Sequence, residues 1–294
     1  YSEDTIQVKF YVNASALIPF IAGGDRELYI QDDLILDASK SKDPDDERNM
    51  GLIFDWKCTF PDNEPCTNAE LKKLNFTNSA IITIPGRTLL PDQDYIFTLT
   101  LKKDTRNAII SRTLRIITGE GPKASLEIED RLIGAKISPA KDFIVNARVV
   151  SGDPISLQYT WSFMNNEFGT MSSVTIPPSS LSGLGTANLI VKKGTFVEGL
   201  DYKISLLVQD SNGQASTSFS ITINKGPTGG IITSNPNIGT AYSTQFILTT
   251  SDWVDEDLPL QYQFAFTENL ADIGDITKLT PCSSWTPSNE VVRR

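Results

Sequence analysis

The sequence predicts an all-β protein made of tandem β-sandwiches, mainly because one short phrase recurs at a nearly constant spacing. Each copy has an aromatic residue with apolar neighbours at its centre, namely Trp56, Trp161 and Phe264. These residues lie 105 and then 103 positions apart, a period typical of one sandwich domain per repeat. Helical periodicity is scarce over the 294 residues, whereas alternation of apolar and polar residues is common. We therefore expect the three aromatic residues to occupy the same core strand in three consecutive domains.

A short apolar strand precedes the central aromatic residue in every repeat. In the second and third repeats it lies at 143–145 and 246–248, 18 positions before the aromatic residue. In the first repeat the matching segment, 34–36, begins 22 positions before Trp56. The additional residues lie in an acidic loop at 40–49.

A β-hairpin follows the central strand in the first and second repeats. In each, four apolar residues alternate with mostly polar ones, as expected of a strand with one buried face. Polar turns at 103–107 and 210–213 follow, and they lead to strands predicted at 113–118 and 218–223. The residues predicted to face the core are Tyr95, Phe97, Leu99 and Leu101 in the first repeat and Tyr202, Ile204, Leu206 and Val208 in the second.

Glycine and proline mark the boundaries between repeats. The segments 119–122 and 225–230 combine these residues between predicted strands. We therefore predict a β-sandwich at 1–120, a second at 121–226 and a third at 227–294. The hairpin of the third repeat is expected at about position 304, one period after Tyr202. Since the sequence ends at Arg294, we expect the third sandwich to be incomplete as given.

Composition and charge exclude several classes of protein. The net charge of -10 disfavours binding to the phosphate backbone of nucleic acids. The sequence has no histidine, which removes Ser-His and Cys-His nucleophilic catalysis and nearly all ordinary zinc sites. Although there are 36 acidic residues, nothing in the sequence places two of them face to face, as glycoside hydrolysis requires. We therefore expect a protein that is not an enzyme and has no cofactor.

The sequence shows neither a membrane span nor a signal peptide. No apolar run reaches the roughly 20 residues that a bilayer requires. The opening residues, 1–4, are polar and acidic, unlike a secretory leader. We expect an internal segment of a larger protein, which meets a membrane only through regions outside this segment.

Several phrases resemble known families. The stretch 36–45, followed by the strand through Trp56, resembles the polycystic kidney disease (PKD) domain, which has an immunoglobulin-like sandwich. The stretch 17–26 is similar to the opening of the receptor for egg jelly (REJ) region, which occurs in polycystins and sperm surface proteins. The Gly-Gly pair at 229–230 and the phrase at 253–262 resemble the middle of such a region.

This resemblance covers essentially the whole chain, although the middle repeat has 151–154 in place of the acidic phrase. It implies tandem immunoglobulin-like sandwiches of the PKD or fibronectin-III type. It also implies an extracellular, cell-surface protein that is tethered to a membrane, often that of a cilium or a gamete.

Cys58 and Cys66 are the most informative local pair. Cys58 ends the strand of Trp56, and the intervening turn contains two prolines. This arrangement predicts a disulfide that closes a small loop, with two free thiols as the alternative. Cys282 has no partner in the segment given, and we expect its partner beyond Arg294.

Two triplets match the acceptor pattern for N-linked glycans. They begin at Asn13 and Asn75. Such triplets also arise by chance, but passage through a secretory compartment would expose both to modification. We therefore predict a glycoprotein.

The acidic loop allows two interpretations. Calcium takes six to eight oxygen ligands, and clustered carboxylates supply some of them. Alternatively, the Asp-Pro-Asp phrase forms a turn in which the aspartates accept hydrogen bonds from nearby backbone N–H groups. The candidate ligands are Asp37, Asp43, Asp45 and Asp46.

Trp56 and Trp161 also have two interpretations. Exposed tryptophans serve as stacking platforms for carbohydrate, but both of these lie mid-strand between apolar residues, at one repeat position. A tryptophan in the sandwich core is the favoured interpretation.

Three functional hypotheses follow. The first is a non-catalytic extracellular segment that acts as an adhesion or ligand-binding module and as a spacer. Its partners would be other protein modules or glycans at the cell surface, together with neighbouring modules of the same chain. The second hypothesis is a structural segment of a ciliary filament or sheath. The third is an accessory module of a secreted hydrolase, which the REJ-like phrases disfavour.

Overall fold

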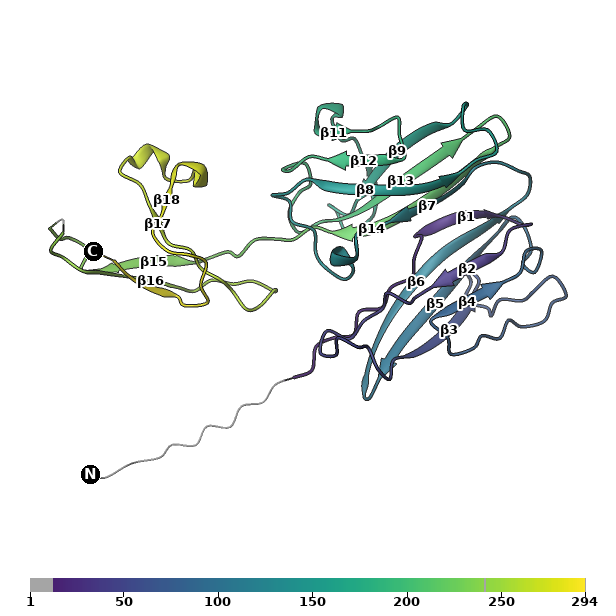
Figure 1. Cartoon of the computed structure of the whole chain (residues 1–294), viewed down its shortest axis with the longest axis horizontal. Helices are drawn as coiled ribbons and strands as arrows, with labels where there is room; N and C mark the ends of the chain where they lie inside the picture. Colours follow the sequence, from purple (N-terminus) through teal and green to yellow (C-terminus); the bar gives the residue numbers. More distant parts are fainter. Residues whose placement is uncertain (1–12, 241, 294) are drawn as a thin grey trace, which may run out of the picture. The chain divides into compact units, whose positions relative to one another are not determined.

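The computed structural model describes residues 13–240 and 242–293, and its regular structure is almost entirely β (Figure 1). The described residues up to Asn224 form one compact unit, and those from Lys225 onward form another. The prediction of an all-β protein is therefore confirmed. Within the described residues, no helix is long and apolar enough to cross a membrane.

The first sandwich is built on the strands predicted around Trp56. Tyr95, Phe97, Leu99 and Leu101 are all fully buried, which confirms the predicted core face. Strands β3, β5 and β6 form one layer, while β2 and β4 pair with each other. The strands are β1 (Asp25–Tyr29), β2 (Leu34–Asp37), β3 (Ile53–Thr59), β4 (Ile81–Ile84), β5 (Gln93–Lys103) and β6 (Arg106–Ile117).

The second sandwich has the same plan with a fuller second layer. One layer contains β9, β10, β13 and β14, and the other has the order β11-β12-β8-β7. Tyr202, Ile204, Leu206 and Val208 are buried between them, as predicted. The strands are β7 (Lys123–Glu127), β8 (Phe143–Val150), β9 (Gln158–Asn165), β10 (Ser172–Val174), β11 (Leu181–Ser182), β12 (Asn188–Val191), β13 (Asp201–Gln209) and β14 (Gln214–Thr222), with short 3-10 helices η1 (Asp130–Leu132) and η2 (Pro178–Ser180).

Both predicted hairpins are present, but their return strands begin earlier than predicted. Strand β6 starts at Arg106 rather than 113, because Lys103 and Arg106 pair directly across a two-residue turn. Asp104 in that turn has φ 51°, in the left-handed region that tight hairpin turns require. Strand β14 likewise starts at Gln214 rather than 218. The polar residues after each turn belong to the return strand, because a strand with one face in solvent carries polar side chains on that face.

The two sandwiches share one continuous sheet, which the sequence analysis does not predict. Strand β1 pairs in parallel with β6 of its own sandwich and antiparallel with β14 of the next. The result is an eight-stranded sheet of order β10-β9-β13-β14-β1-β6-β5-β3 (Figure 1). Separate hydrophobic cores persist on either side of this junction, one around Trp56 and one around Trp161.

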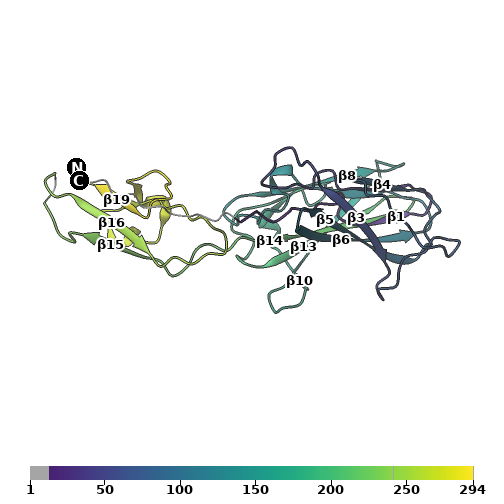
Figure 2. The same cartoon turned by 90° about the horizontal axis from the view of Figure 1, so that it is seen from below.

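The second unit has a smaller sheet of three strands, β15, β16 and β19 (Figure 2). Phe264 is buried, with 3% of its surface exposed, but lies just before a strand of two residues. The prediction that it occupies a core strand like those of Trp56 and Trp161 is therefore wrong, although its burial is as expected. The elements are β15 (Ile231–Asn235), β16 (Phe246–Ser251), β17 (Ala265–Phe266), η3 (Leu270–Asp272), η4 (Ile276–Lys278), β18 (Thr280–Pro281) and β19 (Glu290–Arg293).

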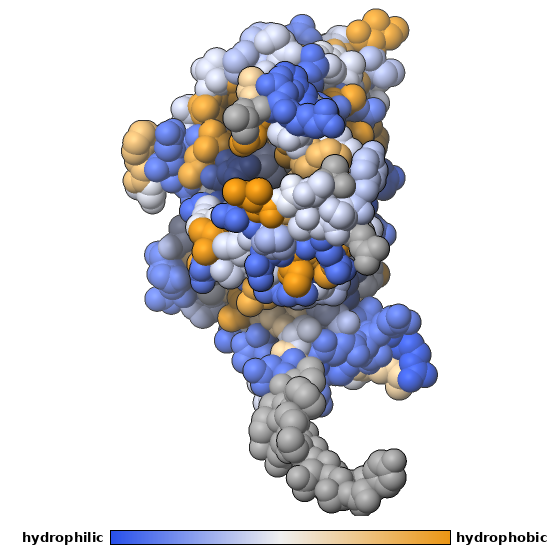
Figure 3. Space-filling model, turned by 90° about the vertical axis from the view of Figure 1, so that its left-hand side faces the viewer, coloured by the Kyte–Doolittle hydropathy of each residue, from blue (hydrophilic) through white to orange (hydrophobic). Residues whose placement is uncertain are grey.

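The surface of the second unit carries many apolar side chains. Figure 3 shows one face of the molecule, on which hydrophobic patches alternate with hydrophilic surface. Every residue of β15 is exposed, including Ile231 and Ile232. The three-stranded sheet and the two-stranded β17–β18 sheet cover less apolar surface than the two full sandwiches do.

Candidate functional site

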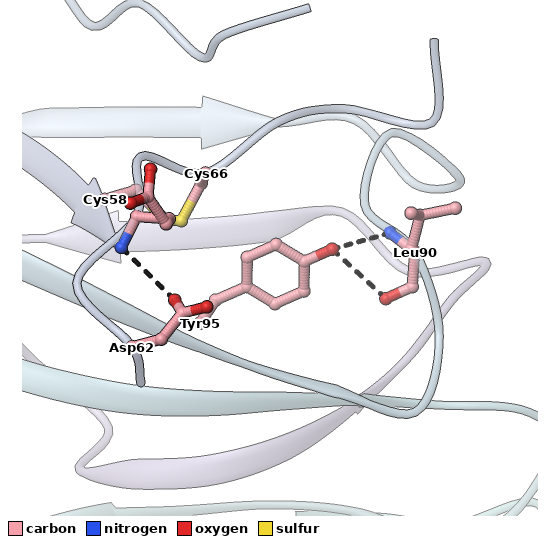
Figure 4. The surroundings of a disulfide bond; sticks show 6 residues. Cys58, Asp62, Cys66, Leu90 and Tyr95 are labelled. Atoms are coloured by element: carbon pink, nitrogen blue, oxygen red, sulfur yellow. Dashed lines mark hydrogen bonds between the residues drawn. A yellow bond between two sulfur atoms is a disulfide. The ribbon is translucent and has the colours of Figure 1, made fainter. Parts of the chain in front are cut away.

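One end of the first sandwich is tied by a disulfide between Cys58, in β3, and Cys66 (Figure 4). Their Cα atoms are 5.3 Å apart, and the Cys66 N–H donates to the carbonyl of Cys58 over 3.1 Å. In the turn between them, Asp62 accepts a hydrogen bond from the N–H of Glu64. Both cysteines are buried against the core, so the pairing predicted from the sequence anchors this loop to the sandwich.

Tyr95 holds the segment that precedes β5 against the same end. Its hydroxyl accepts a hydrogen bond from the N–H of Leu90 over 2.8 Å and lies 3.3 Å from the Leu90 carbonyl (Figure 4). The ring packs on Phe60, with the ring centroids 5.3 Å apart. Burial of the phenol raises the pKa of Tyr95. In the second sandwich, Tyr202 accepts a bond from the N–H of Val197 at the equivalent place, which is the tyrosine corner of such sandwiches.

A shallow groove of about 500 Å³ lies between the disulfide loop and the segment before β5. We call it the disulfide-end groove. Its walls combine apolar side chains with two carboxylates, and Leu71 stands at its edge with 77% of its surface exposed. The lining residues are Phe60, Pro61, Asp62, Thr67, Leu71, Leu90, Gln93 and Asp94.

Leu71 is held in an unusual backbone conformation by the loop around Asn68. The Asn68 side-chain oxygen accepts hydrogen bonds from the N–H groups of Glu70 and Lys72. The N–H of Leu71 donates to the Asn68 carbonyl over 2.8 Å. This tight turn places Leu71 at φ 61°, where a bulky residue is strained. The turn therefore presents one apolar side chain to solvent.

The acidic loop is held by two cations from the β5–β6 turn. The Asp43 carboxylate, only 1% exposed, receives two bonds of 2.8 Å from Arg106 and one of 2.9 Å from Lys103. These hydrogen bonds to the ionised form hold the pKa of Asp43 far below its usual range. Lys103 also bonds Asp46 over 2.8 Å, which lowers the pKa of that carboxyl as well.

The remaining candidate ligands of the acidic phrase are also engaged or lie elsewhere. Asp45 accepts bonds from both the N–H and the hydroxyl of Ser15, which lower its pKa. Asp37 accepts a bond from the N–H of Ser39. In the described part of the chain, no group of three or more metal-ligating side chains is placed to hold an ion. Asp43, Asp45 and Asp46 are instead paired with Lys103 and Arg106, which favours the interpretation of this phrase as a structured turn, and calcium binding stays a prediction.

Trp56 and Trp161 are structural residues of the two cores. Both are buried, and their indole N–H groups donate to the carbonyls of Ser79 over 2.8 Å and Thr186 over 3.0 Å. Neither ring offers a face to a carbohydrate. The core interpretation is therefore confirmed for both residues.

Asn13 and Asn75, the predicted glycan acceptors, both have exposed side chains. Asn75 lies nine positions after Cys66, whereas the acceptor triplet of Asn13 includes Ser15, which bonds Asp45. Exposure permits modification without showing it, so both sites stay predictions.

Sequence patterns missed two features of the first sandwich. From their sequence pattern, Lys103 and Arg106 belong only to a polar turn. Two cations in one turn and several acids in another loop could, however, have indicated ion pairs between the two segments. No sequence signal singles out Leu71, because its conformation depends on the turn around Asn68.

Comparisons with known proteins identify a family for this chain. The REJ domain family matches residues 1–281 of the chain. The mouse polycystin family receptor for egg jelly is 28% identical over 265 residues, which are 84% of this chain and 12% of that protein. Human polycystin-1 is 26% identical over 236 residues, 77% of this chain and 5% of that protein. The chain thus spans a small part of the length of these relatives.

Among solved structures, the N-terminal four Ig domains of Dscam1 isoform 6.44 align with 92% of this chain and 67% of that chain. The sequence identity is 9% and the TM-score 0.28. Extracellular domains 3–5 of Drosophila OTK align with 72% of this chain and 63% of that chain. Here the identity is 12% and the TM-score 0.26.

Proposed function

Because the chain belongs to the REJ domain family, we propose that it is a non-catalytic extracellular segment of a membrane-tethered, polycystin-like protein. In this role it acts as a spacer and as a module for adhesion or ligand binding. The observation that carries the proposal is the family match over residues 1–281, which includes both sandwiches of the first unit. The relatives it resembles are named as a receptor and a polycystin.

The side-chain chemistry supports a non-catalytic role. The sequence contains no histidine to serve as a base. The most strongly perturbed carboxylate described, that of Asp43, is bound to Arg106 and Lys103 rather than facing an open cleft. A group held in two ion pairs stabilises a loop and is poorly placed to exchange protons with a substrate.

The spacer role is supported by the shared eight-stranded sheet. Main-chain hydrogen bonds of β1 to both β6 and β14 leave little freedom for a hinge between the two sandwiches. A membrane-tethered protein that must hold a binding surface at a distance benefits from such a rigid pair.

We assign the binding role to the disulfide-end groove. The turn around Asn68, which follows the cross-linked loop, presents Leu71 beside the groove, and exposed apolar residues next to a concave surface commonly act as binding anchors. Asp62 and Asp94 at the same place favour a partner with basic residues beside an apolar one. The partner we propose is another protein module at the cell surface.

The test is binding of the whole chain to cell surfaces. The chain is secreted from mammalian cells, clustered on a streptavidin scaffold and applied to ciliated epithelial cells. The Leu71→Ser variant is expected to lose most binding, whereas Ile155→Ser, which changes a side chain 96% exposed in another loop, is the matched control. Equal binding by both variants contradicts the groove as the site. Loss of binding after glycosidase rather than protease treatment of the cells identifies a glycan partner instead.

The extracellular location, including the ciliary membrane, is tested on the native protein. Peptide mass mapping is expected to find glycan on Asn13 or Asn75, and antibody labelling is expected to mark the surface of intact cells. Two unmodified asparagines together with purely internal labelling would contradict this location.

A further inference from the structure

We propose that residues 23–29, which we call the linking segment, make the two sandwiches of the first unit a single cooperative folding unit. In this unit neither sandwich opens without the other. The inference concerns stability and does not depend on the proposed ligand.

The linking segment completes both layers of the second sandwich. Its strand β1 places Asp25 opposite Ser218 and Arg26 opposite Thr217 on β14, the outer strand of one layer. The carbonyl of Gly23 accepts a hydrogen bond from the N–H of Leu126 on β7, the outer strand of the other layer. Without this segment, both β14 and β7 would present unpaired main-chain groups to solvent.

The same segment belongs to the first sandwich. Residues 26–29 pair in parallel with 114–117 of β6. Leu114 and Ile116 in that register lie in the first core, and Tyr29 beside them is almost fully buried. Detachment of the linking segment therefore removes a strand from the first sandwich and the edge cover from the second in one event.

Side-chain hydrogen bonds reinforce this junction across long sequence separations. The Glu27 carboxylate accepts a bond of 2.7 Å from the N–H of Ser216, and the Tyr29 hydroxyl donates to the Gln214 carbonyl over 2.9 Å. The Thr217 hydroxyl donates to the Gly23 carbonyl over 3.3 Å. These bonds join residues more than 180 positions apart, so they form only when both sandwiches are folded.

Glycine is required where the two backbones meet. Gly24 has φ +70°, and a Cβ atom there would collide with the carbonyl of Ser218. A Cβ atom at Gly121 would collide with the Tyr29 hydroxyl, and one at Gly213 would collide with the carbonyl of Glu120. The double glycine at 23–24 therefore has a structural purpose, since it allows close approach to the next sandwich.

Coupling follows from what each sandwich loses on separation. The first sandwich loses a strand that pairs with β6, and the second loses partners for β14 and β7. Cooperative units in proteins are defined by such shared contacts, because opening one part uncovers the other. The first sandwich has its own disulfide, so the second is expected to be the less stable of the two once the junction is broken.

The test is hydrogen exchange of the full chain in increasing denaturant, read by mass spectrometry. Amides of β5 report the first sandwich and amides of β13 report the second. In the unmodified chain both sets are expected to lose protection at the same denaturant concentration. In Gly24→Val, the β13 amides are expected to exchange about tenfold faster than the β5 amides at low denaturant, because several junction hydrogen bonds are lost.

Two further variants keep the test decisive. Gly152→Ala, at a glycine that faces open space, is the matched control and is expected to keep the two sets together. Tyr29→Phe removes only the hydroxyl that bonds Gln214, and it replaces Gly24→Val in the test if that variant fails to fold. In Tyr29→Phe the β13 amides are again expected to exchange faster than the β5 amides, but by a smaller factor. The proposal is overturned if the two sets already separate in the unmodified chain, or if Gly24→Val and Gly152→Ala behave alike.

Discussion

The guanidinium of Arg106 donates two parallel hydrogen bonds, each 2.8 Å long, to the carboxylate of Asp43. Asp43 lies in the acidic loop after β2, and Arg106 opens β6, 63 positions later. The pair ties the acidic loop to the β5–β6 hairpin. Two-point Arg–carboxylate pairs of this kind fix geometry as well as charge.

Replacement of Asp43 by Asn is expected to lower the melting temperature of the first unit. The change leaves Arg106 and Lys103 facing a neutral amide in a nearly closed site. Differential scanning calorimetry measures the effect. Asp104→Asn is the matched control, since Asp104 is exposed and lies 3.9 Å from Arg106. Equal melting temperatures for the two variants would contradict a stabilising role for the pair.

The same pair predicts the acid dependence of stability. Folding lowers the pKa of Asp43, and of Asp45 and Asp46, below that of an unfolded aspartate, near 3.9. Such groups contribute stability that is fully present above the unfolded-state value and is lost as the pH falls through the folded-state values. Urea unfolding should therefore show stability falling from about pH 4.5 downward. Asp43→Asn should show a shallower fall, and an unchanged slope would count against this explanation.

Removal of the Cys58–Cys66 disulfide is expected to reduce stability by about 2 kcal/mol, because the closed loop is short. The double variant Cys58→Ala, Cys66→Ala is compared with the original chain in guanidinium unfolding. Cys282→Ser, which changes the free cysteine of the second unit, serves as the control and should leave the first unit unaffected. A double variant as stable as the control would show that the cross-link does not constrain the unfolded chain.

The two corner tyrosines should differ in their contribution. Tyr95→Phe is expected to cost about 1 kcal/mol, because its hydroxyl contacts both the N–H and the carbonyl of Leu90. Tyr202→Phe is expected to cost less, because its hydroxyl bonds the N–H of Val197 over a longer 3.1 Å. Chemical unfolding of both variants measures the difference. A larger loss for Tyr202→Phe would reverse this ranking.

Calcium is expected to leave the protein unchanged. Asp43, Asp45 and Asp46 are already paired with Lys103 and Arg106, so an ion would have to displace two cations that are covalently part of the protein. Thermal melting in millimolar calcium and in chelator should therefore coincide. A rise in melting temperature that is specific to calcium, and absent with magnesium, would restore the calcium interpretation.

Local patterns in the sequence were sufficient for the strands of Tyr95 and Tyr202 and for their buried faces. Alternation identified Tyr95 to Leu101 and Tyr202 to Val208, because a strand with one face in the core must repeat with period two. The disulfide was also predictable, since Cys58 and Cys66 are eight positions apart. The turn preceding β6 was placed correctly, but its length depends on the main-chain pairing of Lys103 with Arg106.

The limits of prediction appear at Phe264. It carries the same phrase as Trp56 and Trp161, and it is buried like them, yet only a two-residue strand follows it. The recurring phrase predicts that its central aromatic side chain is buried in a core, but it does not predict the length of the strand. The length of the strand depends on neighbours that pair with it, and here β17 pairs with the short β18.

The sequence by itself determined the fold class, the repeat, the core faces and the cross-linked loop, because each depends on side-chain patterns within a short stretch. The tertiary structure alone decided that β1 joins two sandwiches into one sheet. It also decided that Arg106 and Lys103 pair with the carboxylate of Asp43 in the acidic loop. Main-chain pairing at a sheet edge leaves little trace in side-chain pattern, and ion pairs between distant segments form only after the chain has folded.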